Sequence, residues 1–298
     1  MNNTITIIGA GTMGNGIAHT FAARSFEVRL LDLRPEALEA ARATIAHNLD
    51  RQIKKELIDE AEKVATLDRI TSHTRLEEAV ADAALVVEAA TENLAVKQQL
   101  FKALGTHCAP DTVLATNTSS ISITKIAAAT ARPDRVIGMH FMNPVPVMPL
   151  VEIINGYRTN PAVTDSVVRT VEQLGKTPLV VNDYPGFVAN RILMPMINEA
   201  IIALHEGVAG VLVIDQIMQL GMAHPMGPLR LADFIGLDVC LSIMRVLHEG
   251  LGSDKYAPCP LLVNMVEAGV LGVKSGEGFY DYAEGPKSQQ VAGRFRSL

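Results

Sequence analysis

The 298-residue sequence contains no tryptophan and only three cysteines, Cys108, Cys240 and Cys259. The cysteines are odd in number, lie far apart and form no C-x-x-C pair, so the sequence predicts neither a disulfide framework nor a structural zinc site. Unpaired thiols suit a reducing compartment. We therefore expect a cytoplasmic protein without a bound metal.

Long apolar runs and excess positive charge are also absent from the sequence. No apolar stretch approaches the about 18 residues that a transmembrane helix needs, and the chain enters the β-branched run 4–8 without a basic region and cleavage site. The formal net charge is −6 and the pI is near 5.8, whereas a general nucleic-acid surface needs clustered positive charge to neutralise phosphates. We expect no export signal, no membrane span and no nucleic-acid partner.

The sequence does contain enough apolar residues for about two folded domains. Hydrophobic residues make up 48% of the chain and charged residues 19%, which is typical of a packed core built mainly from Ala, Val, Ile and Leu. Short apolar runs alternate with helical patterns as far as residue 182, and this alternation predicts an α/β domain with a doubly wound sheet.

The N-terminal motif is a glycine turn between a strand at 4–8 and a helical pattern. It reads Gly9-Ala-Gly11-Thr12-Met13-Gly14. In G-x-G-x-x-G the first Gly makes the tight turn, the second lets the backbone approach a pyrophosphate, and the third lets the helix pack on the strand. The free N–H groups of that helix would then face the phosphates. The sequence therefore predicts a Rossmann dinucleotide site at this loop.

An acidic residue follows the second strand at the spacing that such a site requires. The strand at 27–31 ends before Asp32, which lies 32 − 9 = 23 positions after the first Gly. A carboxylate there binds the ribose hydroxyls and repels a 2′-phosphate, so Asp32 favours NAD. Arg34 leaves NADP open as an alternative.

Polar residues follow three further strands at the point where each is expected to end. Glu92 follows the apolar run 85–88, Ser119 follows 113–116, and His140 is expected to leave the end of a strand at 136–139. In a doubly wound sheet these ends form the ligand crevice, so the three side chains would point to the same place. For Ser119 the alternative is N-capping of the helix expected after Ser122.

His140 is the centre of the predicted chemistry. A proline-rich turn through Pro144, Pro146 and Pro149 brings the chain back to Glu152 and could set a carboxylate beside the imidazole. A neutral imidazole can accept a proton near pH 7, and the carboxylate can fix its tautomer and stabilise the imidazolium. The pair is a candidate general base, and an ordinary hydrogen-bonded pair is the alternative.

A basic cluster lies in a helical, highly charged region at 35–65. Arg51, Lys54 and Lys55 are close together in its middle. They could meet the phosphates of a bulky substrate. The alternative is a solvated helical hairpin.

The domain boundary is expected near residue 184, after a helix at 161–174 and a last strand at 178–182. Residues 185–282 then read as an all-α domain with helices at 188–205, 214–220, 229–247 and 260–267. These helices carry more apolar surface than one small layer hides, which favours a subunit interface over burial against the first domain. The polar remainder at 283–298 is expected to form a partly disordered tail.

Five motifs in order resemble the 3-hydroxyacyl-CoA dehydrogenase family, in its bacterial 3-hydroxybutyryl-CoA dehydrogenase branch. They are Gly-Ala-Gly-Thr-Met-Gly at 9–14, Thr-Asn-Thr-Ser-Ser at 116–120, Gly-Met-His-Phe-Met-Asn-Pro-Val-Pro-Val-Met at 138–148, Pro-Gly-Phe-Val-Ala-Asn-Arg at 185–191 and His-Pro-Met-Gly-Pro at 224–228. The similarity runs from residue 5 to about residue 282.

The resemblance implies a role for each site residue. His140 would be the catalytic base and Glu152 its orienting acid, with Ser119 and Asn190 near the reacting substrate. Besides the glycine loop, the residues around NAD would be Asp32, Glu92, Lys97, Ser119, Asn143 and Lys274. It also implies a homodimer assembled through the helical domain.

The expected reaction is reversible, NAD-linked oxidation of a short-chain (3S)-3-hydroxyacyl-CoA to the 3-oxoacyl-CoA, with the CoA thioester as the bound partner. One alternative keeps the fold and takes a free sugar acid, as in gulonate 3-dehydrogenase relatives. A second is a non-catalytic, crystallin-like dinucleotide-binding protein, against which the intact His140 and Glu152 argue.

Overall fold

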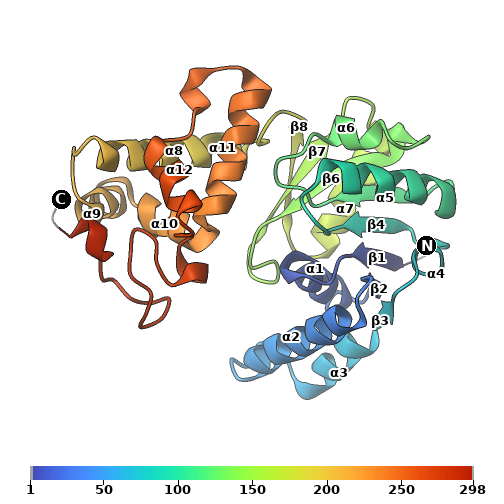
Figure 1. The fold of residues 1–298 in the computed structure, drawn as a ribbon. Helices are drawn as coiled ribbons and strands as arrows, with labels where there is room; N and C mark the ends of the chain where they lie inside the picture. The colour runs from blue at the N-terminus through green and yellow to red at the C-terminus, as the bar shows by residue number, and fades with distance from the viewer. Residues whose placement is uncertain (1–2, 297–298) are drawn as a thin grey trace. The chain divides into compact units, whose positions relative to one another are not determined.

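The computed structural model describes residues 3–296 of the chain. These residues divide into two compact units on either side of the Tyr184–Pro185 bond (Figure 1). Within residues 3–296, no helix combines the length and hydropathy needed to cross a bilayer.

Within residues 3–184, eight strands form one sheet in the order β3-β2-β1-β4-β5-β6-β7-β8. The strands are β1 (Thr4–Ile8), β2 (Glu27–Leu31), β3 (Ile70–His73), β4 (Leu85–Glu88), β5 (Val113–Thr116), β6 (Val136–Phe141), β7 (Leu150–Asn155) and β8 (Thr177–Asn182). Neighbouring strands are parallel from β3 to β6, β7 is antiparallel to β6, and β8 is parallel to β7. The expected doubly wound α/β sheet is confirmed.

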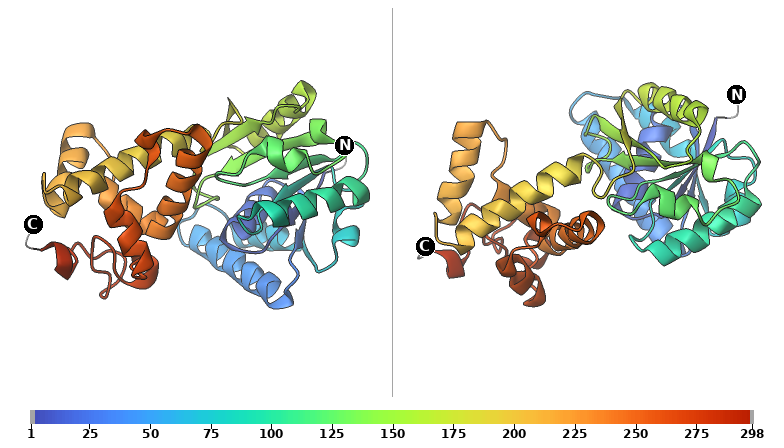
Figure 2. Two further views of the ribbon diagram at one scale, coloured as in Figure 1. Left: turned by 45° about the horizontal axis from the view of Figure 1, so that its top comes forward. Right: turned by 90° about the horizontal axis from the view of Figure 1, so that it is seen from above.

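The helices of this unit cover both faces of the sheet (Figure 2). They are α1 (Thr12–Ala22), α2 (Pro35–Ile53), α3 (Glu60–Asp68), α4 (Leu76–Val80), α5 (Leu94–His107), α6 (Ile123–Ala127) and α7 (Pro161–Gln173), with a 3₁₀ turn η1 (Pro133–Arg135). On one face, α1, α2 and α7 share a single core that includes Phe21, Ile45 and Val167. On the other face lie α5 and α6, with Phe101 and Ile126 fully buried. Strands covered in this way read as the continuous apolar runs seen in the sequence.

The strand order reverses between β1 and β4. The connection from β1 leads outward to β2, whereas the connection from β4 leads the other way to β5. At such a reversal the loops after the two strands diverge and leave a crevice at the carboxyl ends, where α/β proteins bind ligands. The glycine loop and the segment after Glu88 both lie at this point.

The second unit contains α8 (Ala189–His205), α9 (Val211–Met222), α10 (Pro228–Ile235), α11 (Leu237–Leu251) and α12 (Pro260–Glu267), with 3₁₀ turns η2 (Asp254–Tyr256), η3 (Val273–Ser275) and η4 (Gly293–Phe295). The single helix expected at 229–247 is wrong. Gly236 separates α10 from α11 with φ +99°, a left-handed conformation that ends a helix and suits glycine.

The segment after Tyr282 differs from the loose tail expected from its polarity. Val291 pairs with Tyr280 in a β-bridge, and Ala292 and Phe295 belong to the core of the second unit. Two apolar side chains are enough to dock this segment although most of its residues are polar. The last two residues of the expected tail, 297 and 298, lie outside the described part of the chain.

Candidate functional site

Each motif glycine in the loop after β1 has its own surroundings. Gly9 has φ +100°, and a Cβ there would lie 2.6 Å from the carbonyl oxygen of Ala89. A Cβ on Gly14 would lie 1.7 Å from the carbonyl oxygen of Gly9. A Cβ on Gly11 would meet nothing within 4 Å, so packing inside the chain does not require glycine there. Open space at Gly11 fits a loop whose backbone is approached by a ligand.

The N-terminus of α1 opens directly from this loop. Gly11 is the N-cap and supplies no side-chain cap, so the first N–H groups of α1 are available to an anion. Thr12 begins the helix and is exposed, while Met13 is partly buried against the core.

Asp32 is tied to the same loop. Its Oδ2 accepts a hydrogen bond from the backbone N–H of Ala10 at 2.9 Å, and its Oδ1 accepts one from the N–H of Arg34 at 3.1 Å. The carboxylate is thereby held at the carboxyl ends of β1 and β2. The Arg34 side chain is 69% exposed, with Nε 3.6 Å from Oδ1.

His140 and Glu152 occupy opposite positions on β6 and β7. Nδ1 of His140 lies 2.7 Å from Oε2 of Glu152, and both residues are buried. When Nδ1 carries the proton and donates it to the carboxylate, Nε2 is the nitrogen that can accept a proton. The expectation that His140 follows the strand is wrong. It is the last residue but one of β6, and the antiparallel register sets its partner.

The loop at 142–149 joins these two strands. Lys176 Nζ donates hydrogen bonds to the carbonyl oxygens of Val145, at 2.6 Å, and Met148, at 2.7 Å. The loop also packs on α1, because a Cβ on Gly16 would lie 2.9 Å from Val145. Asn143 is exposed on this supported loop.

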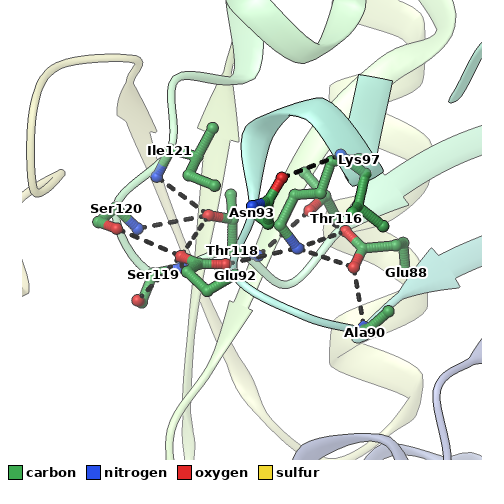
Figure 3. A network of polar contacts seen from close by, with 11 residues as sticks. Glu88, Ala90, Glu92, Asn93, Lys97, Thr116, Thr118, Ser119, Ser120 and Ile121 are labelled. Carbon is green, nitrogen blue, oxygen red and sulfur yellow. Dashed lines mark hydrogen bonds and ion pairs between the residues drawn. The ribbon is translucent and has the colours of Figure 1, made fainter. Parts of the chain in front are cut away.

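Glu92 accepts several hydrogen bonds from the turn that follows β5 (Figure 3). Its Oε1 accepts hydrogen bonds from Thr118 Oγ1 at 2.6 Å, the Ser119 N–H at 2.9 Å, and the hydroxyls of Ser119 and Ser120 at 3.2 Å. Burial acts to raise the pKa of Glu92, but the charge of Lys97 and the bonds from Thr118 and Ser119 bring the net pKa below its ordinary value. Of the three side chains expected at one place, Glu92 and Ser119 are in direct contact.

The N-capping alternative for Ser119 is excluded because Ser122 caps the helix instead. Ser122 is the N-cap of α6 and accepts a hydrogen bond from the N–H of Lys125 at 3.2 Å. Asp183 adds to this cap by accepting from the Ser122 hydroxyl at 2.7 Å. Ser119 therefore does not cap α6.

Lys97 is buried within the first unit. Its side chain is 2% exposed, and its Nζ lies 2.7 and 2.8 Å from the two oxygens of Glu88 and 3.4 Å from Oε2 of Glu92. Its ammonium is thus the counter-ion of Glu88, and its role beside NAD stays a prediction of the resemblance. The sequence analysis did not predict that Glu88 is buried and paired. A charged residue closing the apolar run 85–88 was the signal, because a buried carboxylate needs a partner.

The basic cluster only partly matches its prediction. Arg51 lies in the last turn of α2, but α2 ends at Ile53. Lys54 and Lys55 follow it in the turn towards α3. All three basic side chains are exposed, and within residues 3–296 none takes part in a side-chain hydrogen bond or ion pair. Their charge is available to a ligand.

The remaining two residues belong to the second unit. Asn190 is buried in the first turn of α8, and Lys274 forms an ion pair with Asp238. Their roles beside substrate and cofactor stay predictions of the resemblance.

Comparison with protein families decides the relationship. Residues 4–184 match the NAD-binding domain of 3-hydroxyacyl-CoA dehydrogenase, and residues 186–282 match the C-terminal domain of the same enzyme. The chain belongs to the 3-hydroxyacyl-CoA dehydrogenase family. The first unit is thus an NAD-binding domain, which agrees with the open space at Gly11 and the anchored Asp32.

Individual members of the 3-hydroxyacyl-CoA dehydrogenase family are similar over most of the chain. The probable 3-hydroxybutyryl-CoA dehydrogenase of Bacillus subtilis is 56% identical over 94% of this chain and 97% of its own length. The 3-hydroxybutyryl-CoA dehydrogenase of Bradyrhizobium diazoefficiens is 54% identical over 93% of this chain and 94% of its own length. The crystal structure of (S)-3-hydroxybutyryl-CoA dehydrogenase from Ralstonia eutropha has a TM-score of 0.92 and 48% identity, covering 95% of this chain and all of that one.

Proposed function

We propose that the protein catalyses the reversible, NAD-linked oxidation of a short-chain (3S)-3-hydroxyacyl-CoA to the 3-oxoacyl-CoA, with His140 as general base. The pairing of His140 with Glu152 carries the proposal, because it holds an imidazole in the tautomer that leaves Nε2 as proton acceptor. A non-catalytic dinucleotide-binding protein has no need of this buried pair.

His140 and Glu152 together can remove the proton from the substrate hydroxyl. As the C3 hydroxyl loses its proton to Nε2 of His140, the C3–O bond becomes a carbonyl and the C3–H bond breaks with both of its electrons. Bound NAD supplies the acceptor for that hydride. Glu152 lies 2.7 Å from Nδ1 and stabilises the positive charge that develops on the imidazole. In the reverse direction His140 returns the proton to the carbonyl oxygen.

We assign the reacting end of the substrate to neutral hydrogen-bonding groups, Ser119 and Asn190. A free hydroxy acid would present a carboxylate there, for which a bidentate Arg is the usual partner. The exposed Arg51, Lys54 and Lys55 lie on a separate segment and suit the phosphates of coenzyme A. The relatives named 3-hydroxybutyryl-CoA dehydrogenase support a short acyl chain.

The test is NADH-dependent reduction of acetoacetyl-CoA compared with free acetoacetate. The kcat/KM for the thioester should exceed that for the free acid by orders of magnitude. The ratio of the two values should be smaller in the Lys54→Ala/Lys55→Ala variant. Because binding energy from the remote tail positions C3, kcat should fall as well as KM rise. Lys102→Ala, which removes an exposed lysine on α5, is the control. Comparable turnover of the free acid would instead place the protein with the sugar-acid enzymes.

We further propose that residues 185–282 form the dimerisation domain and that α9 lies in a homodimer interface. Val213, Ile217 and Leu220 repeat at helical spacing along α9 and are 49%, 56% and 86% exposed. They line a hollow on its surface. Exposed apolar side chains that gather in this way mark protein interfaces.

Light scattering after size exclusion tests the dimer. The unmodified protein should show twice the 32.0 kDa chain mass, and Ile217→Asp/Leu220→Asp should shift it towards one chain. Val64→Asp, at a half-exposed apolar residue of α3, should leave the mass unchanged. A double variant of unaltered mass would move the interface away from α9.

We place the protein in the cytoplasm. Cys108, Cys240 and Cys259 are buried free thiols, as suits a reducing compartment.

A further inference from the structure

Glu88 is a buried carboxylate that the proposed reaction does not use. Its side chain is fully buried at the end of β4. It accepts hydrogen bonds from the Ala90 N–H at 2.8 Å, the Thr116 hydroxyl at 2.6 Å and the ammonium of Lys97 at 2.7 and 2.8 Å. A charge buried this completely is tolerated only with such partners.

Lys97 connects this carboxylate to a second one. The lysine reaches back from the first turn of α5, and its ammonium lies between Glu88 and Glu92 (Figure 3). The two distances to Glu88 are short, and the distance to Glu92 Oε2 is 3.4 Å. The ammonium is therefore anchored on Glu88 and attracts Glu92 from a fixed position.

Glu92 transmits this position to the turn after β5. Its Oε2 faces Lys97, while its Oε1 accepts the hydrogen bonds of Thr118, Ser119 and Ser120. The two oxygens of one carboxylate thus join the buried ion pair to the segment that carries Ser119. A carboxylate held from both sides has little freedom to rotate.

We propose that Glu88 is a positioning residue, which acts through Lys97 and Glu92 to orient Ser119 for the reaction. The inference rests on the proposed function, because Ser119 has a catalytic task only there. Lys97 is then the counter-ion through which Glu88 acts on Glu92. Glu88 and Lys97 contribute a fixed charge and geometry and exchange no proton with the substrate.

Two single variants and their combination separate positioning from folding. Lys97→Met leaves two carboxylates without their counter-ion, and Glu88→Gln leaves the ammonium without its anchor, so each should lower the melting temperature. The double variant Glu88→Gln/Lys97→Met removes both charges together and should recover most of that loss. Its kcat/KM with acetoacetyl-CoA and NADH should nevertheless stay roughly 10- to 100-fold below that of the unmodified protein, because Glu92 is no longer held.

The pH dependence of NADH binding supplies a readout that a structural role would not change. Burial raises the pKa of Glu92, and the charge of Lys97 is among the effects that bring it below its ordinary value. In the double variant this charge is missing, so the pKa of Glu92 should rise. The weakening of NADH binding on acidification should then begin at a higher pH than in the unmodified protein.

The control removes another ion pair from the same unit, Arg29 with Asp82. Arg29→Met/Asp82→Asn should change neither kcat/KM nor the pH at which NADH binding weakens on acidification. A Glu88→Gln/Lys97→Met variant with full activity and an unmoved pH profile would make the pair purely structural and overturn the inference. Failure of the unmodified protein to reduce acetoacetyl-CoA would contradict the proposed function instead, so the two failures are distinguishable.

Discussion

His140 lies directly opposite Glu152 on the neighbouring antiparallel strand, with Nδ1 2.7 Å from Oε2. Each residue is held by the backbone ladder of its own strand, so the separation of the two side chains is set by the register of the sheet. This arrangement differs from a pair of loop residues, whose spacing would vary with loop motion. The proton acceptor is thereby oriented before any substrate binds.

The first prediction concerns this pair. His140→Gln should lower kcat by about 10² to 10⁴, the range expected for a general base, while the Kd for NADH changes little. Glu152→Gln should act on the same step, since the carboxylate works through the imidazole. Steady-state kinetics of the double variant give the check. Loss equal to the product of the two single effects would mean that the residues act independently.

The second prediction concerns cofactor choice. NAD(H) should be preferred over NADP(H), because the Asp32 carboxylate is fixed beside the glycine loop and repels a 2′-phosphate. Asp32→Ala should shrink this preference, measured as the ratio of kcat/KM values for the two cofactors. Equal or better use of NADP(H) by the unmodified protein would point to Arg34 and contradict the assignment.

The third prediction is that Gly11 and Gly14 of the same loop have different roles, the first in cofactor binding and the second in stability. Gly11→Ala should leave the melting temperature nearly unchanged, because the new Cβ meets nothing in the chain. It should weaken NADH binding by roughly tenfold or more, since a lost hydrogen bond to a charged phosphate costs about 1.5–3 kcal/mol.

Gly14→Ala is the matched control for that variant. Its Cβ would lie 1.7 Å from the Gly9 carbonyl oxygen, so it should destabilise the fold by about 1–3 kcal/mol or more. Fluorescence titration with NADH and thermal unfolding distinguish the two. A Gly11→Ala protein that binds NADH normally would show that no ligand approaches this loop.

The fourth prediction is a loss of stability in acid caused by His19. This side chain is buried in α1, its Nδ1 has no hydrogen-bond partner within residues 3–296, and burial lowers its pKa from 6.5 to about 4. The unfolded chain takes up the proton first, so stability is complete above pH 6.5 and falls as the pH drops towards about 4. The difference 6.5 − 4 = 2.5 corresponds to about 3 kcal/mol.

Urea unfolding at several pH values measures this effect. His19→Gln should reduce the change in the free energy of unfolding between pH 4 and 6.5, whatever its effect on stability at neutral pH. His47→Gln, at an exposed histidine of α2, should leave the slope as it is. An unchanged slope in the His19 variant would assign the acid sensitivity to other groups.

Several features were predictable because their signals are local. The turn at Gly9 and the contact of Gly14 with it depend on residues five apart, and the spacing to Asp32 follows from one strand-helix-strand unit. The bounds of β4 and α5 agree with the sequence patterns for the same reason. Even the pairing of His140 with Glu152 could be anticipated, since a single short loop joins their strands.

Other features depended on contacts between distant segments. The burial of Lys97 against Glu88 follows from the packing of α5 on the sheet and could not be predicted from helical spacing. Ala292 and Phe295 dock in the core of the second unit although most residues around them are polar, because burial of these apolar side chains outweighs a hydrophilic average.

By itself the sequence determined the glycine loop, the acid that follows it and the order of strands and helices, because backbone preferences and short-range spacing encode them. Only the tertiary structure decided that His140 lies inside its strand and that Glu88 and Lys97 form a buried ion pair. These outcomes depend on which strand lies beside which and on how completely water is excluded between layers. Both are properties of the folded sheet, and no single segment carries them.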